Sequence, residues 1–221
     1  MKRRLPAASW LVMAAFVGVL AAGQMSCQVA GFFIAALEPP KKVKPQYTPP
    51  RNTRVLVFVD DRANPTENEP LRRELTERIN KHLAAQRLVA EVIPYEQVTI
   101  LRASRRDFAT MNEIQVGRGC NADTVLHVRI TDFRLKELDE IPLWDARVAA
   151  MVRWLSVKPE DQHAPCLWPT GNTMTQGFSV AAAVPAKEDT AESFGVLLTQ
   201  QLTERMADTI VKLFYEHEVA P

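Results

Sequence analysis

The sequence lacks the residue patterns that most often mark catalysis or metal binding. Its four histidines show no His-x-x-x-His or His-Glu-x-x-His spacing, which would place two zinc ligands on one helix face; they are His82, His127, His163 and His217. With only 8 glycines in 221 residues, there is no Gly-x-Ser-x-Gly nucleophile turn. Gly117-Arg118-Gly119 lacks the Lys-Ser/Thr of a phosphate loop. We therefore expect no metal, no cofactor and no enzymatic activity.

An excess of charge of either sign is also absent. The 27 basic and 26 acidic residues leave a formal net charge of +1, so no strong summed field draws the chain to phosphate backbones, and nucleic acid is not expected as a partner. The 47% of hydrophobic and 24% of charged residues are ordinary for a globular protein. A chain of this length has room for one domain of ordinary size once its N-terminal segment is set aside.

The N-terminus has the features of an export signal. Lys2, Arg3 and Arg4 precede an uncharged apolar run over residues 10–22, which is the length of a signal-peptide core. The sequence Gly-Gln-Met-Ser-Cys that follows, ending at Cys27, resembles a lipobox, in which a small residue precedes a cysteine that becomes lipidated, for example with palmitate. We predict a signal peptide over residues 1–27 and lipid attachment at Cys27.

Two alternatives to this anchor stay open. Gln24 stands where a lipobox normally carries an aliphatic residue, and a second apolar run follows over residues 29–37. The two runs together exceed the roughly 20 residues that span a bilayer, so an uncleaved transmembrane helix is one alternative. A plain cleaved signal is the other. With a lipid or a helix the chain is attached to a membrane of the bacterial envelope, inner or outer, with its domain on the extracytoplasmic, periplasmic side.

The segment after the cysteine has the composition of a tether. Residues 28–52 begin apolar and continue with five prolines and three lysines, which favour an extended, semi-rigid spacer. The lysines also suit anionic head groups near a membrane surface. We assign residues 53–221 to a single α/β domain.

Hydrophobic periodicity predicts the elements of that domain. Residues 54–59 form a continuous apolar run that is typical of a buried central strand. Residues 66–86 carry leucine or isoleucine at four-residue spacing on one helix face. A strand is predicted over 89–93, short helices over 95–101 and 111–116, and an alternating strand from 123 with a bulge near Asp132 and Phe133.

The second half of the domain is predicted to be antiparallel. A hairpin connection over residues 136–142 leads to a return strand over 146–154, a proline-containing loop over 159–169, and a strand over 178–184. A long amphipathic helix over 188–216 closes the chain. The element order predicts an α/β fold: a mixed sheet with a parallel first half and an antiparallel hairpin second half, packed by the helix after the first strand and by the C-terminal helix.

Several of these segments together resemble a group of bacterial envelope lipoproteins. The matching stretches are residues 55–59, 71–83, 93–98 and above all 116–126, where a helix ends in glycine and an Ala122-Asp123 turn enters a strand. The group includes the curli secretion lipoprotein and the lipoprotein activators of penicillin-binding proteins, and the N-terminal domain of the Tol system's propeller protein looks similar. The resemblance implies a non-enzymatic role in envelope assembly or protein binding, with an envelope protein as partner.

One acidic group is the best ligand site that the sequence offers. Asp60 and Asp61 follow the first strand, with Glu67 and Glu69 close behind, and ligands bind at the carboxyl ends of strands in open α/β sheets. The competing interpretation is an ordinary loop followed by acidic residues at a helix N-terminus. A hydrolase, or a small-ligand or metal-binding protein, using Asp60 and Asp61 is therefore the alternative function.

The two remaining cysteines suggest a disulfide. Cys120 precedes the first hairpin strand and Cys166 follows the second, and these two ends lie side by side in an antiparallel pair. An oxidising compartment favours such a bridge, and closing a loop of about 45 residues contributes roughly 4 kcal/mol in the chain-entropy model. The alternative is that Cys120 is a small buried residue with a free thiol.

Overall fold

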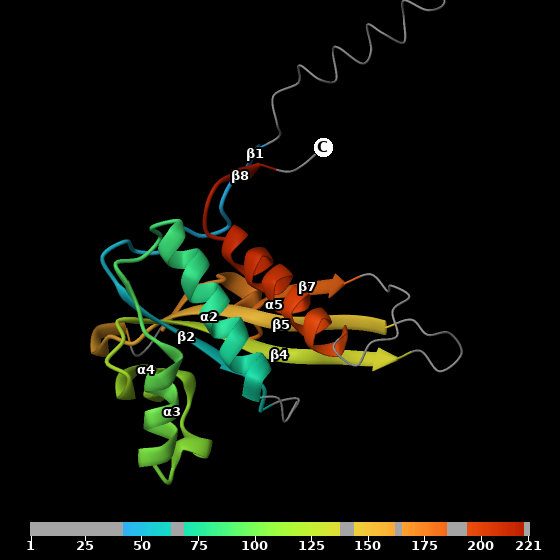
Figure 1. The fold of residues 1–221 in the computed structure, drawn as a ribbon. Coiled ribbons are helices and arrows are strands. Elements are labelled where there is room, and N and C mark those ends of the chain that lie inside the picture. The colour runs from blue at the N-terminus through green and yellow to red at the C-terminus, as the bar shows by residue number, and fades with distance from the viewer. Residues whose placement is uncertain (1–41, 63–68, 138–143, 162–164, 185–193, 219–221) are drawn as a thin grey trace, which may run out of the picture. The chain divides into compact units, whose positions relative to one another are not determined.

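The computed structural model describes residues 42–62, 69–137, 144–161, 165–184 and 194–218 (Figure 1). The chain divides into two compact units, Val43–His217 and a second formed by Met1–Lys42 with Glu218–Pro221. The predicted signal peptide, Cys27 and the first part of the tether lie outside the described residues. Within the described ranges, no helix is both long and apolar enough to cross a membrane.

A mixed six-stranded sheet forms the centre of the unit Val43–His217. Its order is β3-β2-β4-β5-β6, and β7 pairs with β5 as well. The central strand β2 lies parallel to β3 and β4, whereas β5 lies antiparallel to β4, β6 and β7. The strands are β2 (Arg54–Asp60), β3 (Glu91–Val92), β4 (Thr124–Glu137), β5 (Trp144–Ser156), β6 (Cys166–Trp168) and β7 (Phe178–Val184). A separate two-stranded sheet pairs β1 (Lys42–Val43) with β8 (His217–Glu218).

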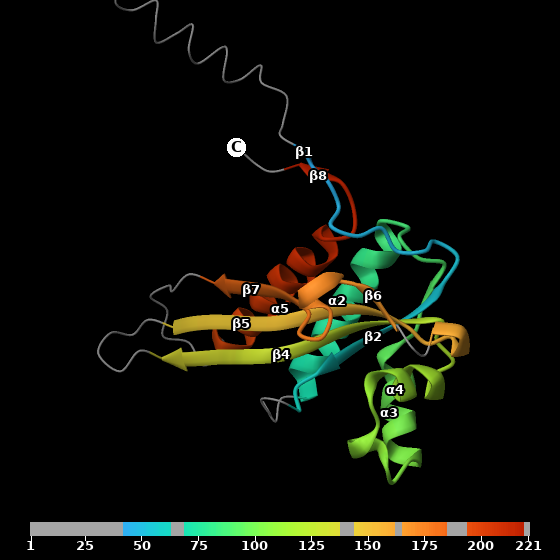
Figure 2. The same ribbon diagram turned by 180° about the vertical axis from the view of Figure 1, so that it is seen from behind.

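The strand order places helices on both faces of the sheet. The connection from β2 to β3 contains α2 (Glu69–Ala85), and the connection from β3 to β4 contains α3 (Tyr95–Ser104), the short 3-10 helix η1 (Phe108–Thr110) and α4 (Glu113–Gly119). Because β3 and β4 lie on opposite sides of β2, two right-handed crossovers run in opposite directions and lie on opposite faces. Figures 1 and 2 show α2 on one face and α3 and α4 on the other.

The larger core lies beneath α2 and α5 (Phe194–Lys212). Alternate residues of β2, β4, β5 and β7 point into it, and the leucine and isoleucine stripe of α2 meets them. At one end, Trp154 packs edge-to-face on Phe214 with ring centroids 4.9 Å apart, and Trp168 lies 5.6 Å from the same ring. This aromatic group fixes the end of α5 on the sheet.

A smaller core lies on the opposite face beneath α3 and α4. Leu56 and Phe58 of β2, Val125 of β4 and Leu155 of β5 form its sheet side. The helix α4 approaches closely because Gly117 has no side chain: a Cβ there would lie 2.5 Å from Val125 Cγ2. Asn112 caps this helix in a reciprocal pair with Gln115.

The observed elements confirm the predicted fold class, a mixed α/β sheet with a C-terminal helix. The bulge falls between Ile130 and Asp132, close to its predicted place. The loop over residues 159–169 differs from its prediction, because Cys166–Trp168 forms β6 and pairs with β5 through the register positions of Trp154 and Leu155. This strand is three residues long, too short for an alternating pattern to reveal it.

Candidate functional site

The first candidate site lies at the carboxyl end of β2, around Asp60. This side chain is buried on the α3–α4 face of the sheet. The guanidinium of Arg62 donates to both of its oxygens, with Nε to Oδ1 at 2.8 Å and Nη2 to Oδ2 at 2.7 Å. Arg62 Nη1 also donates to the Met111 carbonyl at 2.8 Å. Asp60 is thus held in a bidentate ion pair, the strongest arrangement available to a carboxylate in a protein.

The second predicted ligand, Asp61, has an arginine partner of its own. Arg72 Nη1 donates to Asp61 Oδ2 across the first turn of α2. Both side chains are largely shielded from solvent, at 15% and 13% exposure for Arg72 and Asp61. The structure therefore brings both predicted aspartates together at one strand end, each bound by a guanidinium. Among the described residues, no group of three or more His, Cys, Asp or Glu side chains could hold a metal ion.

A buried histidine extends this network across the sheet. His127 of β4 is 3% exposed, stacks on Phe58 with centroids 5.8 Å apart, and holds Nε2 3.5 Å from Asp60 Oδ2. Its Nδ1 lies 3.2 Å from Arg153 Nη2, and the same Nη2 donates to Glu113 Oε1 at 2.5 Å. A chain of polar contacts therefore runs from Asp60 of β2 through His127 of β4 and Arg153 of β5 to Glu113 in the first turn of α4.

The network holds its carboxylates in the charged form. Burial alone raises the pKa of Asp60, but the interactions with His127 and Arg62 outweigh it and bring this pKa well below its usual range. For Glu113, burial likewise raises the pKa, but its own backbone amide and the positive charges nearby lower it overall. Asp60 and Glu113 are therefore both stabilised as anions.

A cleft of about 410 Å³ adjoins this end of β2. Its wall is strongly basic, with five arginines and one aromatic ring: Arg62, Arg72, Arg102, Arg105, Arg106 and Phe108. Asp61 is the one acidic residue that lines it within the described parts of the chain. Arg102 lies over the Phe108 ring at 5.1 Å from its centroid, and Arg105 forms a bidentate pair with Asp107.

The second candidate site is the part of the sheet that α3 and α4 do not reach. Beyond Arg153, the register aligns side chains of β5 and β7 on this face, among them Arg147 opposite Ala183 and Ala149 opposite Ala181. We call these four residues, with Ser179, the open strip. Arg147 and the three β7 side chains of the strip are exposed, and Ala149 is half-buried. Figure 2 shows this face of β4, β5 and β7 toward the viewer, without α2 and α5 in front of it.

The outer edge of β7 borders the open strip. Among the described strands, β7 pairs only with β5. Ser156 donates its backbone N–H to the carbonyl of Pro165, just before β6, at 2.7 Å. Even-numbered residues of β5 therefore direct their backbone groups toward β6 and β7. In β7 the groups of residues 179, 181 and 183 then point outward, and the Ala183 carbonyl accepts a hydrogen bond from Arg205 at 2.9 Å.

The two cysteines lie in the smaller core, and no bond joins them in the structure. Cys120 is buried there, and Cys166, half-buried, packs against the same cluster. Cys166 Sγ has the carbonyl oxygens of Trp168, Pro169 and Met174 within 3.4–3.5 Å. Burial raises the pKa of the Cys120 thiol to about 11. The hairpin does bring the two cysteines to one cluster, and the disulfide between them stays a prediction.

The sequence predicted the acidic residues at the end of β2 but not the arginines around them. Asp60 and Asp61 were identifiable because they follow a continuous apolar strand. The arginines that bind them come from α2 and from the residue after Asp61, and those of the cleft wall come from the end of α3. The run Leu101-Arg102-Ala103-Ser104-Arg105-Arg106 carries a signal for this basic wall. Its significance depends on the crossover that places α3 beside the end of β2.

Comparisons with known proteins identify no family. No family model matches the chain, and no curated protein matches it. Among solved structures, the dodecamer of a single-residue variant of PelC from Paraburkholderia phytofirmans is similar at 12% identity and a TM-score of 0.42, covering 80% of this chain and 98% of that one. Lipoprotein GNA1162 from Neisseria meningitidis matches at 14% identity and a TM-score of 0.40, covering 70% of this chain and 98% of that one. A minor lipoprotein from Acinetobacter baumannii matches at 9% identity and a TM-score of 0.36, covering 72% and 89%.

Proposed function

We propose that this chain is a membrane-anchored lipoprotein of the bacterial envelope, and that its α/β domain works by binding another envelope protein and not by catalysis. The anchor rests on the basic residues, the apolar run and the lipobox-like sequence that ends at Cys27. Export would place the domain on the periplasmic side of the membrane. The resemblance to the curli secretion lipoprotein, the penicillin-binding-protein activators and the Tol propeller protein supports the same role.

The open strip and the outer edge of β7 carry the binding proposal. The edge of a sheet offers backbone N–H and C=O groups on which an extended segment of another protein adds as a further strand. On β7 these are the outward groups of Ser179 and Ala181, since the Ala183 carbonyl is already bound by Arg205. The β7 side chains on the strip are Ser179, Ala181 and Ala183, small enough to let a partner approach the backbone. Arg147 adds a guanidinium beside them that suits a carboxylate on the partner.

The acidic alternative receives less support from the same geometry. A metal ion or a hydrolytic mechanism at Asp60 and Asp61 needs carboxylate oxygens directed at a ligand. Here Arg62 takes both oxygens of Asp60, and Arg72 binds Asp61. Replacing an arginine pair by a cation would require both ion pairs to break, each in a partly buried setting.

A matched pair of substitutions tests the binding surface. Ala181→Lys places a long charged side chain on the open strip, where lysine on an edge strand blocks strand addition. Ala84→Lys makes the same change at an exposed position of α2. Pull-down of the intact anchored protein from crosslinked membranes is expected to recover a specific partner with the wild type and Ala84→Lys, and to lose it with Ala181→Lys. Recovery of the bait alone in every case would contradict the proposal.

The anchor needs a separate test. Metabolic labelling with palmitate is expected to mark the wild-type chain and to fail in Cys27→Ala, with loss of the variant from the membrane fraction. Unlabelled chains that stay in the membrane would favour the uncleaved helix over residues 10–37. Release of the unlabelled wild type into the periplasm would favour a plain cleaved signal.

A further inference from the structure

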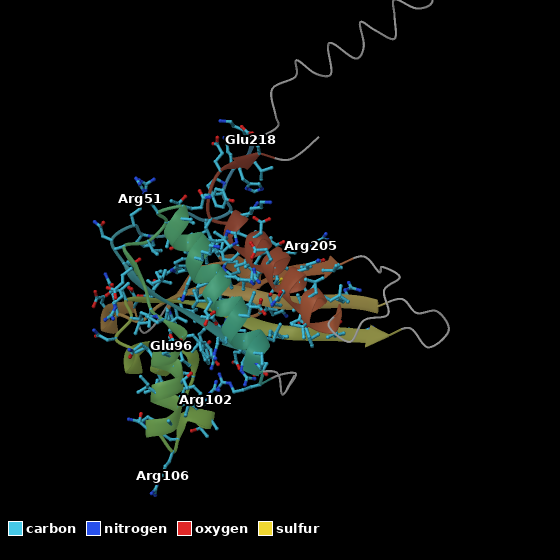
Figure 3. All side chains as sticks on the ribbon, viewed as in Figure 1. Arg51, Glu96, Arg102, Arg106, Arg205 and Glu218 are labelled. Carbon is cyan, nitrogen blue, oxygen red and sulfur yellow. The ribbon has the colours of Figure 1, made fainter. Side chains whose placement is uncertain are left out.

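Two arginines from different elements converge on one point of the outer edge of β7. Arg147 of β5 lies opposite Ala183 in the strand register, with its exposed side chain on the open strip. Arg205 belongs to α5, which covers the other face of the sheet, and its Nη1 donates to the Ala183 carbonyl at 2.9 Å. Figure 3 shows Arg205 on the side of α5 that is away from α2. The two guanidiniums therefore flank the Ala183 end of the edge, one from each face of the sheet.

Neither guanidinium is bound to a carboxylate within the described parts of the chain. The side chain of Arg147 makes no hydrogen bond or ion pair with a described residue, and that of Arg205 binds the uncharged Ala183 carbonyl. The acidic residues next to Arg205 on α5 already have partners, because Glu204 binds α2 and Asp208 binds a lysine of its own helix. Among the described residues, two positive charges at this end of β7 thus remain without an acidic partner.

The strand register favours an Arg147 side chain that reaches toward β7. On its β4 side, Arg147 lies opposite Arg134, and like charges directly opposite each other in a sheet repel. Arg134 already has an anion, since its Nε lies 3.3 Å from a carboxylate oxygen of Asp132. On the β7 side, Ala183 presents only a methyl group. The guanidinium of Arg147 is therefore favoured over Ala183, toward the outer edge of the sheet.

A strand added to β7 would meet both guanidiniums at a defined position. Its backbone can pair with the outward groups of Ser179 and Ala181, whereas Arg205 holds the Ala183 carbonyl. The added strand would lie two strand spacings from β5, about 9.5 Å, and extended arginine and glutamate side chains together span that distance. A carboxylate beside Ala183 would accept paired N–H groups from the guanidiniums, the geometry that arginine fits best.

The sequence of β7 argues against a second copy of this chain as the added strand. The strand reads Phe-Ser-Val-Ala-Ala-Ala-Val and carries no acidic residue. Pairing between two β7 edges would therefore bring the guanidiniums of each copy beside a strand without a carboxylate. A different protein with an acidic extended segment fits the charge at this edge.

We propose that the partner adds an extended segment along β7 and that an acidic residue of this segment, a glutamate by its reach, binds Arg147 and Arg205 beside Ala183. This inference rests on the proposed function, because it specifies what the open strip and the outer edge of β7 receive. It adds a requirement that strand addition alone does not make. The partner segment must be acidic at the Ala183 end, and its binding must weaken as salt screens the charges.

Photo-crosslinking in living cells tests this requirement. A benzophenone side chain replaces Ser179, at the end of the open strip away from Ala183, in the full anchored chain. It is combined with Arg147→Gln/Arg205→Gln or with the control Arg51→Gln/Arg106→Gln. The crosslink yield is expected to fall at least about tenfold in the first double variant, through loss of charge-assisted hydrogen bonds, and to stay within about twofold in the control.

The control removes the same number of charges from exposed positions, and Figure 3 places Arg51 and Arg106 away from Arg205. Because all four arginines are exposed, circular dichroism should report an intact fold in both double variants. Mass spectrometry of the crosslinked peptide should find Glu or Asp within a few residues of the crosslinked position. Replacing that residue by Lys should abolish the crosslink, and Arg147→Glu/Arg205→Glu should restore it.

The outcomes separate this inference from the function on which it rests. A discrete crosslink that survives Arg147→Gln/Arg205→Gln would overturn the acidic requirement and leave strand addition standing. Equal loss in the control, or a crosslinked segment without an acidic residue, would do the same. Absence of a discrete crosslink with all arginines intact would contradict the proposed binding surface itself.

Discussion

The two faces of the sheet differ sharply in chemistry. Beneath α2 and α5, buried apolar side chains form a continuous core that ends in the group of Trp154, Trp168 and Phe214. The other face carries a small apolar core beneath α3 and α4. Beside this core lies the network of Asp60, His127 and Arg153, and beyond Arg153 lies the open strip.

This contrast separates the residues that stabilise the fold from those that could bind. Burial of apolar area dominates the stability of a domain, and most of that area lies on the α2–α5 face. The opposite face places charges and small exposed side chains on a rigid support. Substitutions on the first face should therefore act on unfolding, and substitutions of the exposed residues of the open strip should act mainly on binding.

The largest effect is expected at Trp154. Its side chain is fully buried and packs on Phe214, so Trp154→Ala should lower the free energy of unfolding by about 3–5 kcal/mol. Val196→Ala, at a residue 64% exposed on α5, should change it by less than about 0.5 kcal/mol. Denaturant titration of the full chain measures both. Similar losses of unfolding free energy in the two variants would contradict the claim that the core beneath α2 and α5 stabilises the fold.

A smaller loss is expected where α4 meets the sheet. A Cβ at Gly117 would lie 2.5 Å from Val125 Cγ2 and 2.8 Å from Val157 Cγ2, so Gly117→Ala should destabilise the domain by about 1–3 kcal/mol through overpacking. Gly119→Ala meets the flexible end of Leu101 and should be milder. The same denaturant titration compares them, and a Gly119 variant that is less stable than the Gly117 variant would refute the close approach at α4.

Asp60 should make the stability of the charged network depend on pH. Its pKa in the folded chain is lowered, so its contribution is fully present above the unfolded value near 4 and is lost as the pH falls below it. Asp60→Asn should destabilise the domain at pH 7 by about 1–3 kcal/mol. The difference from the wild type should shrink between about pH 5 and pH 2. A difference that stays constant or grows in acid would contradict the ion pair with Arg62.

The smallest effect concerns the cysteines. In the reduced, folded chain, the burial of Cys120 and its pKa of about 11 should make an alkylating reagent react faster at the half-buried Cys166 than at Cys120. Mass spectrometry after brief labelling measures the ratio. In the unfolded, unreduced chain, two labelled thiols at these positions would exclude the predicted disulfide, and none would establish it.

The central strand and its neighbours were predictable because their patterns are local. An uninterrupted apolar run marks β2, and four-residue spacing marks α2. The predicted first turn of that helix over residues 66–68 lies outside the described residues, as does residue 188, where the C-terminal helix was predicted to begin. The strands over 124–137 and 144–156 are longer than predicted, because pairing across a hairpin extends strands beyond their own alternating pattern.

The chemistry of the candidate sites was harder to predict than the fold. Asp60 and Asp61 were correctly placed at the end of β2. Their ion pairs with Arg62 and Arg72 were not predicted, and Arg72 comes from α2. The sequence predicts His127 as one residue of an alternating strand. No local pattern predicts that Arg153 contacts His127 or that Glu113 binds Arg153. Such contacts depend on the strand order, which periodicity leaves open.

Site-specific photo-crosslinking tests the contrast between the two faces most directly. A benzophenone side chain is placed at Ala181 on the open strip or at Ala84 on the outer side of α2, and cells that carry the anchored chain are irradiated. One discrete crosslinked protein is expected from Ala181, and it should be absent from Ala84. Crosslinking from Ala84 and not from Ala181, or from neither, would contradict the claim that the open strip is the binding surface.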